Sequence, residues 1–337
     1  MKKLVILFVL LIGVNAFAAD SGYHIVKRLK LGGEGGWDYL TVDAKARRLY
    51  VSRSSHVMVI DLDTDKVVGD IPNTPGVHGI AVAPELNRGF TSNGKADIST
   101  IFDLKTLKMI GEVKTGKNPD AIIYDPATKS VFTFNGRSQD ATVFDATTGK
   151  VLRKIALGGK PEFAATDGTG KIYVNIEDTG EVVLLDSTNA HEVQRFSVAP
   201  CSEPSGLALD AKHGRVYSGC HNRIMTVLDM AAGRVISSVP IGGHVDGNGY
   251  DPGTGLAFSA NGDGTLTVAR EVSPGRFEVV NTIVTQPGAR TMAIDPVTHN
   301  IYLPAAQFAP AGDSQQGSQK ARPEMIKGTF DIIVVGR

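Results

Sequence analysis

A unit of about 42 residues recurs seven times along this chain of 337 residues, and it limits the fold more than any other feature of the sequence. The stretches 49–71 and 131–157 share one pattern: an apolar-aromatic strand, a polar tip, an alternating strand closing in Asp, a turn and a further strand. The closing Asp recurs at steps of 41 to 43 residues, at Asp61, Asp103, Asp145, Asp186 and Asp229. Short alternating strands at this period are typical of propeller blades rather than helical solenoids. The sequence therefore predicts an all-β, seven-bladed β-propeller.

Two further markers support the number of copies. The residue that closes the first strand recurs at Asp43, Ala83, Asp125, Asp167, Asp210, Asp251 and Asp295. An aromatic residue recurs in the second strand of every copy, at Tyr50, Phe90, Phe132, Tyr173, Tyr217, Phe258 and Tyr302. An aromatic ring at this place buries a large area between neighbouring twisted sheets. We expect these seven rings to belong to the core.

The seventh copy ends with its third strand, Asp331 to Val335, and lacks a fourth strand of its own. The alternating segment from Tyr23 to Leu31 is predicted to supply it, so that the N-terminal strand joins the C-terminal blade. This pairing would close the ring and remove its exposed strand edges. We therefore predict a single propeller domain over residues 19–337, although a chain of this length often forms two domains.

The first residues have the features of a secretory signal peptide. Lys2 and Lys3 precede an apolar run from Leu4 to Val14, and Ala16-Phe17-Ala18 matches the small-x-small cleavage pattern. The run is shorter than the roughly 20 residues that span a membrane. We expect residues 1–18 to be removed, leaving a periplasmic or otherwise exported protein with no membrane span; the alternative is an uncleaved anchor.

Charge narrows the class of partner. The chain has 35 basic and 35 acidic residues, and loss of Lys2 and Lys3 leaves 33 against 35. A nearly neutral protein has no overall attraction to nucleic acid or to anionic membranes. We expect a monomer that binds a protein, a peptide or a small polar ligand.

One polar position recurs where each first strand begins, next to the central channel. Its occupants are Asp38, His78, Asp120, Glu162, Ser205, Asp246 and Arg290. Converging carboxylates repel one another, and a cation or a basic ligand among them lowers that energy. The ring therefore suggests a divalent cation, either Ca²⁺ or Mg²⁺ or a transition metal. The alternative is an internal ion-pair network that includes Arg53 and Arg290.

A second ring on the same face lies at the tips that leave the second strands. It consists of Arg53, Asn93, Asn135, Ile176, Cys220, Asn261 and Ala305. The Asn residues precede Gly, and Asn-Gly is also a common hairpin turn. Trp37 precedes Asp38 and is either a packing anchor or a stacking surface for a ligand. The predicted ligand-binding residues are Trp37, Asp38, Arg53, His78, Asp120, Glu162, Asp246 and Arg290.

Two other features belong to this face. Cys201 and Cys220 both reach the mouth of the fifth blade, and two cysteines in an exported protein most simply form one disulfide. A free thiol or a metal-binding pair is the alternative. Residues 304–328 form a long loop in blade seven, which is either a lid over the channel or a mobile excursion.

The second-strand tetrads Tyr50-Val51-Ser52-Arg53 and Tyr173-Val174-Asn175-Ile176 each precede an apolar strand that closes in Asp. In this the chain resembles the YVTN-repeat (YncE-like) β-propeller family of exported bacterial proteins. The resemblance implies the fold and the export, and it transfers no catalytic residue. Every copy departs from Y-V-T-N.

Propellers serve as binders, scaffolds, lyases, lactonases and quinoproteins alike. The chain contains no nucleophile elbow, zinc helix, phosphate loop or haem-attachment motif. We therefore favour a non-catalytic binding or scaffold protein that uses the channel mouth. The alternative is a metal-dependent, lactonase-like hydrolase or lyase, with the carboxylates and His78 at the mouth.

Overall fold

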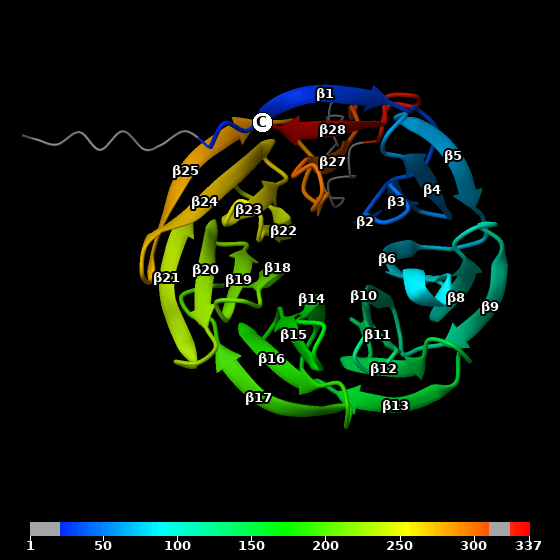
Figure 1. The fold of residues 1–337 in the computed structure, drawn as a ribbon, viewed down its shortest axis with the longest axis horizontal. Coiled ribbons are helices and arrows are strands. Elements are labelled where there is room, and N and C mark those ends of the chain that lie inside the picture. The colour runs from blue at the N-terminus through cyan, green and yellow to red at the C-terminus, as the bar shows by residue number, and fades with distance from the viewer. Residues whose placement is uncertain (1–20, 310–323) are drawn as a thin grey trace, which may run out of the picture.

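Seven four-stranded antiparallel sheets stand around a central axis like the blades of a fan (Figure 1). The computed structural model of the chain describes residues 21–309 and 324–337. In blades one to six the chain runs from an inner strand at the axis to an outer strand at the rim, whereas the outer strand of blade seven is the N-terminal strand. The predicted all-β, seven-bladed propeller is confirmed.

The blades are as follows. Blade one contains β2 (Leu40–Asp43), β3 (Arg48–Arg53), β4 (His56–Asp61) and β5 (Lys66–Ile71). Blade two contains β6 (Val77–Ala83), β7 (Arg88–Asn93), β8 (Ile98–Asp103) and β9 (Met109–Lys114), with a short 3₁₀ turn η1 (Pro84–Leu86). Blade three contains β10 (Pro119–Asp125), β11 (Ser130–Asn135), β12 (Asp140–Asp145) and β13 (Val151–Ala156). Blade four contains β14 (Pro161–Thr166), β15 (Lys171–Ile176), β16 (Glu181–Asp186) and β17 (His191–Ser197).

Blade five contains β18 (Pro204–Asp210), β19 (Arg215–Cys220), β20 (Ile224–Asp229) and β21 (Arg234–Pro240). Blade six contains β22 (Val245–Asp251), β23 (Leu256–Asn261), β24 (Thr265–Ser273) and β25 (Arg276–Val284). Blade seven contains β26 (Ala293–Ile294), β27 (Ile301–Ala305), β28 (Asp331–Gly336) and β1 (His24–Lys30).

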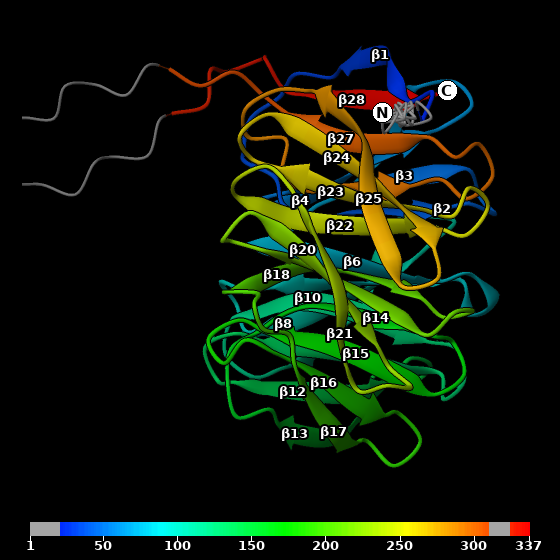
Figure 2. The same ribbon diagram turned by 90° about the vertical axis from the view of Figure 1, so that its left-hand side faces the viewer.

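The N-terminal strand closes the ring as predicted. β1 pairs antiparallel with β28, from His24 opposite Gly336 to Lys30 opposite Asp331. Figures 1 and 2 show β1 on the outside of β28, which completes the seventh blade. The ring of Tyr23 packs edge-on against Phe258 of blade six at a centroid distance of 5.2 Å. The first and last parts of the chain are therefore joined by both backbone pairing and side-chain packing.

The core lies between blades. The seven recurring aromatic rings are buried, with at most 2% of their surface exposed. Tyr50 of blade one packs on Phe102 of blade two, and Phe90 of blade two packs on Phe144 of blade three, at centroid distances of 5.9 and 5.8 Å. Each ring removes a large apolar area from water at the junction of two sheets. The prediction that these rings are core residues is confirmed.

The face that carries the turns between first and second strands and between third and fourth strands is here called the turn face. The Asp residues that close third strands cap its turns: the backbone N–H and the hydroxyl of Thr64 both donate to Asp61, each at 2.7 Å. The Asp residues that close inner strands also link blades, because Arg47 of blade one reaches Asp295 of blade seven at 2.7 Å. Asp residues at the ends of strands therefore stabilise turns and also form a contact between blades.

The predicted boundary of the blade-seven loop is wrong at its start. β27 continues through Pro304 to Ala305, so the loop begins at Ala306. Phe308 and Met325 form an isolated antiparallel bridge between its two described ends. The rest of the predicted loop, residues 310–323, and the predicted signal peptide, residues 1–18, lie outside the described residues. Within the described ranges no helix has the length and apolar character needed to cross a membrane.

Candidate ligand site at the channel mouth

The side chains predicted at the channel mouth project from irregular starts of the inner strands. His78, Asp120, Glu162, Ser205 and Asp246 are each the second residue of an inner strand. In all five strands the pairing register shifts at this point, which marks a β-bulge. A bulge turns a side chain away from the regular alternation and is common beside functional sites. The repeated bulge therefore turns this position toward the axis.

Polar groups of the neighbouring strands hold this backbone in place. The Ser52 hydroxyl accepts the N–H of Asp38 at 2.9 Å, and the Ser92 hydroxyl accepts the N–H of Gly79 at the same distance. The Asn175 side-chain amide donates to the carbonyl of Ser205 at 2.9 Å. Irregular backbone that would otherwise lack partners is thus hydrogen-bonded. These second-strand residues support the ring without belonging to it.

Three side chains from consecutive blades meet at the mouth. His78 Nδ1 donates to Asp38 at 2.6 Å and lies 3.7 Å from Asp120. One possible ligand atom from each of the three residues lies within 4.8 Å of the other two. In this cluster, Asp38–His78–Asp120, three of the predicted site residues come within a few ångströms of one another.

The cluster shifts the pKa values of its members upward. Burial disfavours the His78 imidazolium, but the hydrogen bond to Asp38 and the charge of Asp120 prevail and raise the pKa of His78 to about 9. Burial, with the charges of Asp38 and Asp246, raises the pKa of Asp120 to about 7 in spite of His78. Burial also raises the pKa of Asp38. Carboxylates that resist ionisation in this way cluster at functional sites.

The other ring members form two separate groups. Asp246 pairs with Arg290 at 2.5 Å and accepts the hydroxyl of Ser205 at 3.1 Å. Glu162 pairs with Lys160, which also pairs with Glu177. Burial and the charge of Asp120 raise the pKa of Glu162 to about 8 against the effect of Lys160. The predicted ion-pair alternative therefore exists at Arg290, whereas Lys160 and Glu177 were not predicted.

An aromatic pair that the sequence did not reveal crosses the channel just inside the mouth. Tyr39 precedes the inner strand of blade one, and Phe163 lies on the inner strand of blade four. Their rings meet edge-on at a centroid distance of 5.1 Å, although the two blades lie on opposite sides of the ring (Figure 1). The contact therefore joins two blades that are not neighbours in the ring.

Trp37 lies in an apolar hollow beside the charged cluster. The hollow has a volume of about 500 Å³ and is lined by Gly36, Trp37, Pro287, Gly288, Arg290, Phe308 and Met325. The indole ring lies 5.9 Å from the ring of Phe308 and 5.5 Å from that of Phe330. Trp37 thus packs on other aromatic rings and at the same time forms a wall of the hollow. Arg290 joins the hollow to the charged ring, because it also pairs with Asp246.

Arg53 lies at the end of β3, as predicted, but its side chain is buried and is not accessible to a ligand. Its side chain is 0% exposed, its guanidinium donates to the carbonyls of Glu34 and Gly35 at 2.8 and 3.1 Å, and it stacks over Phe330 at 3.6 Å. The connector before blade one covers it, which the strand pattern could not indicate. We therefore leave Arg53 out of the site and of the ion-pair network.

The asparagines of the second ring are also internal. The Asn93 amide donates to Thr100 at 2.8 Å, and its oxygen accepts the hydroxyl of Thr91 at 2.9 Å. Asn135 and Asn261 make the equivalent bonds to Thr142 and Thr267, both at 3.1 Å. These amides fasten the strand tips within their own blades.

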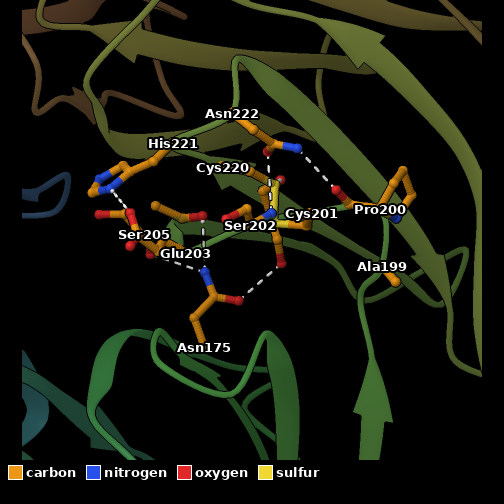
Figure 3. The surroundings of a disulfide bond; sticks show 12 residues. Asn175, Ala199, Pro200, Cys201, Ser202, Glu203, Ser205, Cys220, His221 and Asn222 are labelled. Carbon is orange, nitrogen blue, oxygen red and sulfur yellow. Dashed lines mark hydrogen bonds and ion pairs between the residues drawn. A yellow bond between two sulfur atoms is a disulfide. The ribbon is translucent and has the colours of Figure 1, made fainter.

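The predicted disulfide joins Cys201 and Cys220, with a Cα–Cα distance of 5.5 Å. Figure 3 shows that the surrounding loop is also fastened by Asn222, which donates to the carbonyl of Pro200 and accepts the N–H of Ser202. His221 pairs with Glu203 on the same loop at 2.9 Å. The disulfide prediction is confirmed, and it braces the mouth of blade five.

Comparison with known structures supports the architecture. The solved structure of Kuenenia stuttgartiensis hydrazine synthase matches with a TM-score of 0.71 over 80% of this chain and 92% of that chain. This chain is a seven-bladed β-propeller. The sequence identity of 15% limits the likeness to the fold. No model of a protein family matches the chain, and no curated protein matches it.

Proposed function

We propose that this propeller is an exported binding protein whose channel mouth holds a ligand with an apolar group next to a cationic group. The observation that carries the proposal is the position of the hollow at Trp37, which adjoins the acidic ring through Arg290. Its volume falls within the usual range for small-ligand sites, about 300–1,000 Å³. An apolar hollow beside a few convergent polar groups is the usual form of such sites.

The cationic part of the ligand follows from the charges around the mouth. The ring carboxylates are Asp38, Asp120, Glu162 and Asp246, and the cationic groups that pair with them are His78, Lys160 and Arg290. The carboxylates outnumber these cations, and Lys160 is shared with Glu177 as well. A ligand ammonium group would favour the ionised forms of Asp120 and Glu162, whose pKa values are raised in its absence. A basic peptide side chain or a small amine has this chemistry.

One observation and two predictions from the sequence support the export of the protein. A disulfide is favoured in oxidising compartments such as the bacterial periplasm. The predicted signal peptide addresses the chain to the same compartment. The resemblance to YVTN-repeat propellers, which we propose as the family, adds the expectation of an exported bacterial protein.

The single tryptophan of the chain makes the proposal directly testable. Trp37 fluorescence is measured while the protein is titrated with phenethylamine, and separately with 3-phenylpropionate, which has a similar size and the opposite charge. We expect a saturable change with the amine and a much weaker response to the acid. Phe308→Ala should weaken amine binding roughly 2- to 10-fold, because one aromatic contact is lost.

The matched control is Val297→Ala, which shortens an exposed apolar side chain outside the hollow. It should bind the amine as the unmodified protein does. Equal responses to the amine and the acid, or no saturable response to either, would contradict the proposal.

The alternative of a metal-dependent hydrolase or lyase needs a cation at the mouth in addition to a general base.

A further inference from the structure

We infer that Asp38, His78 and Asp120 form a binding site for one divalent transition-metal ion. This goes beyond the proposed ligand binding, because none of the three residues lines the hollow at Trp37. The site would place a metal ion on the channel axis, next to the position proposed for the ligand. Its ligands would come from blades one, two and three.

The distances suit a metal. In a tetrahedral site with bonds of about 2.0–2.2 Å, ligand atoms lie roughly 3.3 Å apart. The observed distances from His78 Nδ1 are 2.6 Å to Asp38 and 3.7 Å to Asp120, which lie on either side of that value. Shifts of well under 1 Å in each side chain, with release of the Nδ1 proton of His78 to solvent, would therefore create the geometry.

A second observation concerns the charge of the cluster. Among the described residues, Asp38 and Asp120 share one cationic ion-pair partner, the imidazole of His78. Only 17% of the Asp38 side chain and 15% of the Asp120 side chain are exposed. Two carboxylates close together in such surroundings repel one another, and a divalent cation between them would lower that energy.

The cluster differs from the other histidine–carboxylate contacts of the molecule. Four other histidines pair with a single carboxylate each: His56 with Asp70, His213 with Asp210, His221 with Glu203 and His299 with Asp251. Over residues 21–309 and 324–337, only Asp38, His78 and Asp120 bring three possible ligand atoms together. A histidine between two carboxylates is therefore not a recurring structural contact of the described residues.

The donor set indicates the type of ion. One imidazole nitrogen and two carboxylate oxygens suit Zn²⁺ or Mn²⁺, whereas Ca²⁺ prefers six to eight oxygens. Three protein ligands also leave positions for water, as in metal sites that bind substrates. His78 and Asp120 lie at bulges within the strands β6 and β10 rather than on free loops.

The experiment uses mature protein stripped with a chelator and then titrated calorimetrically with Zn²⁺, Mn²⁺ and Ca²⁺. We expect one equivalent of Zn²⁺ or Mn²⁺ to bind more tightly than Ca²⁺. His78→Gln and Asp120→Asn should each weaken binding by about 100-fold or more, because even residues that only support a metal ligand contribute about 10- to 100-fold. The control is His221→Gln, which removes an imidazole from the same face and should leave the affinity unchanged.

Circular dichroism establishes that each variant is folded. An X-ray absorption spectrum of the unmodified zinc-loaded protein gives a readout that needs no variant, and one imidazole with oxygen neighbours is expected. The inference is overturned by absence of stoichiometric binding, by unchanged affinity in folded His78→Gln, or by a spectrum without imidazole. Phenethylamine titration of the metal-free protein tests the proposed ligand binding separately, so the two can fail independently.

Discussion

The two faces of this propeller treat carboxylates in opposite ways. On the turn face, hydrogen bonds from the side chain and the backbone of Thr64 lower the pKa of Asp61, and those from Thr148 lower that of Asp145. At the channel mouth, burial raises the pKa values of Asp120 and Glu162. The surroundings of these carboxyl groups therefore favour the anionic form on the turn face and the neutral form at the channel mouth.

The difference separates structural carboxylates from candidate functional ones. A carboxylate with a lowered pKa stabilises the fold at neutral pH, whereas one with a raised pKa lowers stability there. Groups that lower stability are expected where binding of a ligand or an ion compensates for the cost. The contrast thus supports the channel mouth, and not the turn face, as the binding surface.

The largest effect should come from removing a carboxylate that links blades. Asp295 is fully buried and accepts hydrogen bonds from Arg47 and Thr298. Asp295→Ala should lower the free energy of unfolding by about 3 kcal/mol, because it removes the buried partner of Arg47 and leaves that cation with the exposed Asp63 alone. Asp120→Asn at the mouth should change it by less than about 1 kcal/mol. Urea unfolding measures both, and equal losses would remove the contrast between the faces.

Two arginines extend the same contrast. Arg53 donates to backbone carbonyls and stacks on Phe330, so Arg53→Lys should destabilise the protein by about 2 kcal/mol. Arg290 is partly exposed and pairs with Asp246, so Arg290→Lys should cost less than about 1 kcal/mol. Thermal unfolding compares the two variants, and a larger drop in melting temperature for Arg290→Lys would contradict a structural role for Arg53.

The pH dependence of stability should show both faces at once in metal-free protein. The raised pKa of His78, about 9, contributes stability below its unfolded value of 6.5 that is lost as the pH rises to 9. The raised pKa of Asp120, about 7, adds a penalty as the pH rises from 3.8 through 7. Stability should therefore rise by roughly 3 kcal/mol or more between pH 9 and pH 5, since the pKa shift of His78 alone corresponds to that amount.

Below about pH 4 the trend should reverse. Turn-face carboxylates with lowered pKa values, including Asp295, take up protons in the unfolded chain at a higher pH than in the folded protein, so stability falls as the pH falls. Asp120→Asn should flatten the rise between pH 9 and pH 5 and leave the acid limb unchanged. Urea unfolding at fixed pH values is the measurement. A stability that increases steadily from pH 5 to pH 9 would contradict the raised pKa values at the mouth.

Much of the blade architecture could be predicted because it depends on repetition along the chain. The seven core aromatics recur at one position of the unit, and strand alternation alone sends that position inward. The missing strand of the last copy required the first segment, now β1, to complete it. The two cysteines lie 19 positions apart, at loops that one blade brings together.

The side-chain contacts at the channel mouth could not be predicted, because they depend on closure of the ring. The repeats indicated which residues would reach the channel, but not that Tyr39 would meet Phe163 from an opposite blade or that Lys160 would draw Glu162 aside. The pattern also placed Arg53 at the mouth, whereas the connector at Glu34 and Gly35 folds over it. Local sequence determined the strands, their order and the residues that face the axis, because these follow from short-range alternation and repetition. Only the tertiary structure decided which of those side chains touch, because distances across the channel arise from packing seven blades into a closed ring.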